Sequence, residues 1–68
     1  MRTIFKERLK ELRIEKSLEQ KELAAILHVS KSTVSAWEVG RNQPSYEVLG
    51  DIAAFFDVTV DYLLGFIN

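Results

Sequence analysis

The sequence predicts an all-α fold, a compact bundle of five short helices in a single domain spanning residues 1–68. Apolar residues recur at spacings of three and four along most of the chain, as on one face of a helix. Short breaks rich in Ser, Gly, Asn and Pro separate these segments. Nowhere do β-branched and polar residues alternate between turn residues, so strands are not expected.

The first two helices are predicted over residues 4–15 and from about residue 20 onward, with a break at residues 16–18. Lys and Glu fill the outer positions of the first helix. Ser17 and Gln20 have the spacing of a capping box, although Glu19 is an equally good boundary residue. The apolar faces of the two helices are formed by Phe5, Leu9, Leu12, Leu23, Ala24 and Leu27.

Three further helices are predicted from their boundary residues. Ser30 is a good N-cap for the third helix, which is expected to end at Gly40. Pro44-Ser45 opens the fourth helix, and Thr59 caps a short fifth helix from Val60 to Leu64. The inner side of the fourth helix is predicted to consist of Val48, Leu49, Ile52, Ala53 and Phe56.

Composition excludes several classes of function. The chain has no Cys and one His, so disulfides, thiolate zinc sites and cysteine nucleophiles are ruled out. His28 is the single candidate metal ligand or general base, and it is better explained as a turn residue; no metal, cofactor, small-molecule substrate or enzyme activity is expected. No apolar run is long enough for a membrane span or a signal peptide. A cytoplasmic protein is predicted, and so small a core makes a partner chain plausible.

The net charge of −1 hides an asymmetry along the chain. All nine Lys and Arg residues lie in residues 1–41, together with six Glu, so this part carries +3. Residues 42–68 contain four acids and no base, and carry −4. Such segregation is typical of a protein with a polyanion-binding face, although a solvated helical surface explains it equally well.

Residues 20–39 have the pattern of a helix-turn-helix motif, two short helices joined by a tight connection. At about 100° per residue, Trp37 and Glu38 fall on the same side of the third helix as Val34. That side is expected to pack on the body, and Trp37 is interpreted as a core residue. The opposite side is small and polar, as a helix in the DNA major groove requires. It consists of Lys31, Ser32, Ser35, Ala36 and Val39.

Over residues 5–65 the chain resembles the phage-repressor (Cro-like, or xenobiotic-response-element type) helix-turn-helix domains. The matching residues are Leu18, Gln20, Glu22, Leu23, Ala24, Val29, Ser30, Val34, Trp37, Glu38, Gly40, Arg41, Pro44, Leu49, Ile52, Ala53, Val58, Asp61, Tyr62, Leu63, Leu64 and Gly65. The resemblance implies a sequence-specific transcription regulator, usually a repressor, that binds double-stranded DNA as a homodimer.

The resemblance also implies roles for individual residues. Base edges would be faced by Lys31, Ser32, Ser35 and Ala36. Phosphates would be contacted by Gln20, Thr33, Arg41 and Asn42. Arg13 and Glu38 match a structural ion pair of the family. Two positions depart from the family pattern: His28 replaces a frequent Gly but tolerates positive φ, and Glu19 replaces a Ser, Thr or Asn, which is expected to weaken the cap and to lower DNA affinity.

A dimer surface is predicted near the end of the sequence. So small a core cannot cover all of its apolar side chains, and exposed apolar patches usually mark an interface. The residues of this surface are Val60, Tyr62, Phe66 and Ile67. A two-fold dimer would place its recognition helices about 34 Å apart and require a near-palindromic site. The alternative is a protein-interaction module of the same fold, such as an antitoxin that binds a toxin. The acidic second half and Glu19 favour that alternative, and the bases of residues 31–41 oppose it.

Overall fold

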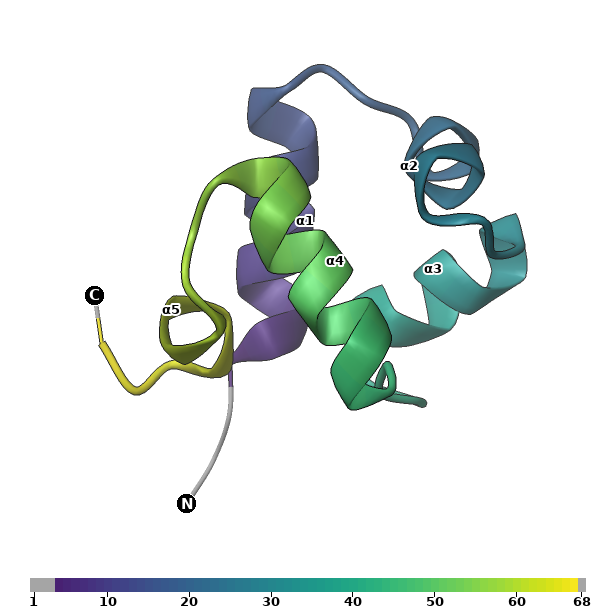
Figure 1. Cartoon of the computed structure of the whole chain (residues 1–68). Helices are drawn as coiled ribbons and strands as arrows, with labels where there is room; N and C mark the ends of the chain where they lie inside the picture. The colour runs from purple at the N-terminus through teal and green to yellow at the C-terminus, as the bar shows by residue number, and fades with distance from the viewer. Residues whose placement is uncertain (1–3, 68) are drawn as a thin grey trace.

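The computed structural model of the chain describes residues 4–67. It contains five helices (Figure 1), and no strand is present in that range. Their bounds are α1 Phe5–Glu15, α2 Gln20–Leu27, α3 Lys31–Glu38, α4 Tyr46–Phe56 and α5 Val60–Leu64. The all-α fold with five helices is therefore confirmed.

Helices α2 and α3 lie on one side of the molecule and α5 lies on the other, with α1 and α4 between them (Figure 1). α1 packs against α3 and α5, and α4 packs against α2 and α5. The core between them consists of Phe5, Leu9, Leu12, Leu23, Ala24, Leu27, Val34, Trp37, Leu49, Ile52, Ala53, Phe56 and Leu63. The apolar faces predicted from the spacing are buried, apart from Val48, which is half-buried, and Trp37 is a core residue as expected.

Side-chain caps begin three of the helices. The hydroxyl oxygens of Ser30, Ser45 and Thr59 accept hydrogen bonds from the backbone N–H three residues later, at 3.2, 3.2 and 3.0 Å. Each such cap contributes about 1 kcal/mol to stability. At the start of α2 the N-cap is Glu19, and its backbone N–H donates to Glu22 Oε1 at 2.7 Å. Of the two boundaries that the sequence allowed, the structure therefore has Glu19, supported by the carboxylate of Glu22.

The connections between helices use left-handed residues. His28, in the turn between α2 and α3, has φ 60°, which confirms that it can replace the usual Gly there. Ser17 and Asp57 also have positive φ, each at 57°, after α1 and α4. Gly65 ends α5 with φ 86° and packs against the side chain of Ile4.

Arg8 of α1 bonds to α5 and to the residues that follow it. Its Nη1 donates to the carbonyl oxygens of Tyr62 at 2.6 Å and Ile67 at 2.7 Å, and the guanidinium carbon lies 4.1 Å from the centroid of the Tyr62 ring. These contacts fix α5 and the residues after it against α1. Within residues 4–67, every helix is too short or too polar to cross a membrane.

Gly65→Ala and Gly50→Ala are predicted to change stability in opposite directions. A Cβ on Gly65 would lie 2.9 Å from Ile4 Cγ1, at a φ that L-residues rarely adopt, so Gly65→Ala should cost at least about 1 kcal/mol. Gly50 lies inside α4 with nothing within 4 Å of its Cβ position, so Gly50→Ala should gain about 0.5–1 kcal/mol.

Thermal unfolding checks this pair of variants. In a domain of this size 1 kcal/mol corresponds to a shift of roughly 4–8 °C in Tm. A decrease for Gly65→Ala together with an increase for Gly50→Ala is expected. Equal shifts of the same sign would contradict the packing of Gly65 on Ile4.

Candidate nucleic-acid interface

The outward surface of α3 is small and polar, as its sequence predicted. Lys31 and Ser32 are exposed at its N-terminal end, and Ser35 is half-buried in the next turn. Val34 and Trp37, on the inward side, are 0% and 3% exposed. The remaining outward side chain, Val39 after the last turn, is 60% exposed.

The outward position predicted for Ala36 is corrected by the structure, because this side chain is buried at 7% exposure. The chain folds back over the end of α3 after Gly40, and the backbone N–H groups of Arg41 and Asn42 both point at the carbonyl oxygen of Ala36, at 2.9 and 3.4 Å. Helical spacing takes no account of such a return of the chain near the end of the helix. Ala36 is therefore removed from the base-facing set.

Three hydroxyl groups meet at the start of α3. Ser30 Oγ lies 3.0 Å from Ser32 Oγ and 2.8 Å from Thr33 Oγ1, and it also accepts from the backbone N–H of Thr33. A hydroxyl offers one donor and two acceptor sites, so this cluster keeps acceptor and donor capacity for a ligand. Thr33, predicted to contact a phosphate, is half-buried within it.

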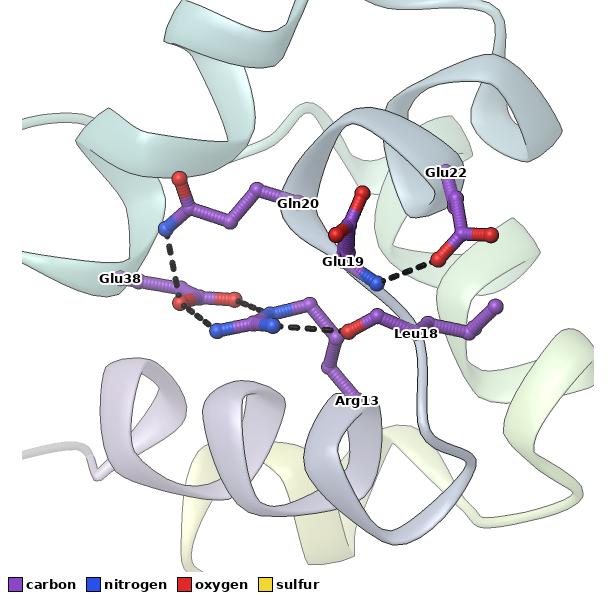
Figure 2. Close-up of polar contacts among 6 residues, drawn as sticks. All are labelled: Arg13, Leu18, Glu19, Gln20, Glu22 and Glu38. Atoms are coloured by element: carbon purple, nitrogen blue, oxygen red, sulfur yellow. Dashed lines mark hydrogen bonds and ion pairs between the residues drawn. The ribbon is translucent and has the colours of Figure 1, made fainter.

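Arg13 and Glu38 form the structural ion pair that the resemblance implied (Figure 2). Arg13 Nε and Nη2 donate to the two carboxylate oxygens of Glu38 at 2.6 and 2.9 Å. The side chains are 12% and 3% exposed. The hydrogen bond to Glu38 raises the pKa of Arg13 above its ordinary value, against the opposing effect of burial. Arg13 makes a third contact, in which Nη1 donates to the carbonyl oxygen of Leu18 at 2.8 Å. The segment before α2 is therefore bonded to the guanidinium group that also binds Glu38.

Gln20, predicted to contact a phosphate, also makes a hydrogen bond inside the protein. Its Nε2 donates to Glu38 Oε1 at 3.0 Å (Figure 2). The carboxylate accepts, so the amide nitrogen of Gln20 faces Glu38. One of its two N–H groups is used in this bond, and the second remains a donor. Its backbone N–H, at the first position of α2, belongs to the group of amides that have no partner within their helix. A phosphate contact of Gln20 stays a prediction, for which its backbone N–H and the second N–H of its side-chain amide are both available.

Arg41 and Asn42, the other two predicted phosphate-contacting residues, extend from the loop after α3 with exposed side chains. Together with Lys31 they place positive or polar groups at both ends of α3. The acids of the second half lie elsewhere: Glu47 and Asp51 are exposed one turn apart on α4. The helices of the second half, α4 and α5, thus carry acids and no base, whereas α1 and α2 carry both.

The residues of the predicted dimer surface differ in exposure. Phe66 and Ile67 are each 50% exposed. Val60 and Tyr62 are half-buried, and the ring of Tyr62 lies under Arg8. No group of three or more His, Cys, Asp or Glu side chains within residues 4–67 could hold a metal ion.

Comparisons with known proteins agree with this geometry. A family model described as helix-turn-helix matches residues 9–63. Over 60 residues the chain is 47% identical to the HTH-type transcriptional activator BcrR of Enterococcus faecalis, covering 88% of this chain and 29% of that protein. The chain spans about half, or less, of the length of the curated relatives it matches.

Solved structures show the same fold. The P22 c2 repressor in complex with a synthetic operator superposes with a TM-score of 0.83 at 28% identity, over 88% of this chain and 91% of that chain. A hydroxypropylphosphonic acid epoxidase from S. wedmorenis contains the fold in 32% of its chain, with a TM-score of 0.79 at 31% identity over 88% of this chain. Because one fold can serve different proteins, the site and not the fold must carry the function.

The chain belongs to the helix-turn-helix family, and its fold is that of the phage-repressor DNA-binding domains. Its family and its curated relatives are transcription regulators.

The Arg13–Glu38 pair is predicted to be strongly coupled. Arg13→Met leaves a buried carboxylate with Gln20 as its remaining partner, so it should cost on the order of 3 kcal/mol. Glu38→Leu should cost less, because the guanidinium of Arg13 retains Leu18 and lies closer to solvent. The double variant should lose clearly less than the two single losses added together.

Denaturant unfolding of the four proteins gives this coupling directly. Losses that simply add would mean that Arg13 and Glu38 do not act as a unit, and would contradict a structural role for this ion pair.

Proposed function

We propose that this chain is a sequence-specific DNA-binding transcription regulator that inserts α3 into the major groove of a near-palindromic operator. One observation carries the proposal: Glu38 is the sole acid of α3, and it is turned inward at 3% side-chain exposure. The surface that α3 turns to solvent therefore carries no carboxylate that would repel phosphates. Phosphates line both edges of the groove, so a helix that enters it needs such a surface.

The contacts divide into two kinds. Lys31 would reach a guanine O6 or N7, and the hydroxyls of Ser32 and Ser35 would donate to or accept from base edges. Phosphates would be held by the backbone N–H of Gln20 and by the side chains of Thr33, Arg41 and Asn42. Phosphate contacts supply affinity and position, whereas base contacts supply specificity.

A homodimer is proposed because one short helix reads few base pairs. The half-exposed Phe66 and Ile67, together with Val60 and Tyr62, would form its two-fold interface. Two copies of α3 would then lie about 34 Å apart on one face of the DNA. We propose repression as the outcome, since occupation of an operator needs no further contact, whereas activation needs a surface for the transcription machinery.

The second candidate is a protein-interaction module, such as an antitoxin. Four exposed acids, Glu47, Asp51, Asp57 and Asp61, favour it because exposed carboxylates attract a basic protein. Both candidates are consistent with the fold, and DNA binding discriminates between them.

Selection from a randomised DNA duplex pool at moderate salt tests the proposal. Enrichment of a palindrome with half-sites one helical turn apart is expected for a dimeric, sequence-specific regulator. Absence of bound DNA even at low salt would reject DNA binding and leave the interaction module as the better function.

Lys31→Ala is predicted to reduce the specificity of DNA binding, whereas Arg41→Ala is predicted to reduce its affinity. Lys31→Ala should reduce the discrimination between the selected site and a scrambled duplex by about 1–3 kcal/mol. Arg41→Ala should weaken binding to both duplexes by the same factor. It should also make the slope of log Kd against log salt smaller by about 0.9. Titrations of both duplexes at several salt concentrations measure these effects, and equal loss of discrimination in the two variants would contradict the assignment.

A further inference from the structure

A cleft of about 170 Å³ lies between the start of α1 and the loop after α3. It is lined by Phe5, Lys6, Trp37, Gly40, Asn42 and Gln43. Trp37 and Phe5 are core residues and form its floor, whereas Asn42 and Gln43 come from the exposed loop. A water molecule takes up roughly 30 Å³ in the liquid, so the cleft has room for a tetrahedral oxyanion.

Lys6 reaches this cleft across Gly40. A Cβ on Gly40 would lie 3.1 Å from Lys6 Cδ and 3.6 Å from its Nζ. The absence of a side chain at Gly40, which its φ of 80° also favours, lets the lysine stem lie along the backbone. The ammonium is thereby held beside the loop that carries Arg41 and Asn42.

The charge of the cleft is positive. None of its six lining residues is acidic, and Asn42 and Gln43 bring amide groups that can donate hydrogen bonds. The ion pairs formed within residues 4–67 are Arg13–Glu38 and Lys21–Glu19, so Lys6 is a member of neither. A lysine with amide neighbours and no carboxylate is suited to an anion.

We propose that this cleft binds a phosphate of the DNA backbone, with Lys6 as the charged contact and the Asn42 and Gln43 amides as further donors. This inference rests on the proposed DNA binding and extends it to α1, whose residues the sequence pattern left out of the interface. Lys6 adds to the phosphate contacts at the C-terminal end of α3, where Arg41 also lies.

Lys6→Gln and Lys10→Gln form a matched pair for the test. Both remove one positive charge from an exposed position on α1, and Lys10, one turn further along the same face, lies outside the cleft. A non-specific duplex at low salt serves as the probe, so the experiment does not depend on knowing the operator. Thermal unfolding of each variant checks that the fold is intact.

Lys6→Gln should make the slope of log Kd against log salt smaller by about 0.9 and weaken binding on the order of 5–10-fold near 0.1 M salt. Lys10→Gln should have less than half that effect on Kd, and Lys6→Arg should bind as the parent chain does. Equal effects of Lys6→Gln and Lys10→Gln in a protein that binds DNA would overturn the inference. A parent chain that binds no duplex would reject the proposed function itself.

Titration with inorganic phosphate, followed by backbone amide NMR at constant ionic strength, separates the two sources of a phosphate group. Weak, unsaturated shifts at Gly40 and Asn42 are expected, since the DNA backbone supplies the neighbouring contacts. Saturation below millimolar phosphate would identify a free-anion site and overturn the assignment to DNA.

Discussion

The position of α3 depends on one buried ion pair. Arg13 spans three parts of the chain, because it bonds to both oxygens of Glu38 on α3 and to the carbonyl oxygen of Leu18 before α2. Gln20, the first residue of α2, donates a further hydrogen bond to the same carboxylate. Removing two charges from water is costly, and a buried pair contributes little net stability even when its geometry is good. Its effect here is to fix the orientation of the two motif helices relative to α1.

The same pair shapes the electrostatics of the interface. Glu38 is neutralised inside the protein, so the carboxylate of α3 does not oppose a polyanion. Lys31 and Arg41 lie at the two ends of α3, whereas the exposed acids Glu47 and Asp51 lie on α4. A protein with this distribution approaches DNA in a preferred orientation, and the attraction weakens as salt screens it.

Local signals in the sequence were sufficient for the helices and their caps. Ser30, Ser45 and Thr59 act within four residues of themselves, and the helical spacing of apolar residues depends only on the turn. What the sequence did not predict depends on segments that meet in space. The loop after Gly40 bonds to the backbone carbonyl oxygen of Ala36, the carboxylate of Glu38 accepts from the amide of Gln20, and Lys6 reaches the loop from another helix. None of these contacts has a periodic signature.

Backbone amide NMR during titration with duplex DNA tests whether α3 is the DNA-binding helix, because it reports on every part of the surface at once. We expect shifts concentrated at Lys31–Ser35, at Gly40–Gln43 and at Gln20, with little change at the exposed Glu47 and Asp51 of α4. Shifts centred on α4, or no shift at any residue of α3, would contradict DNA binding by α3.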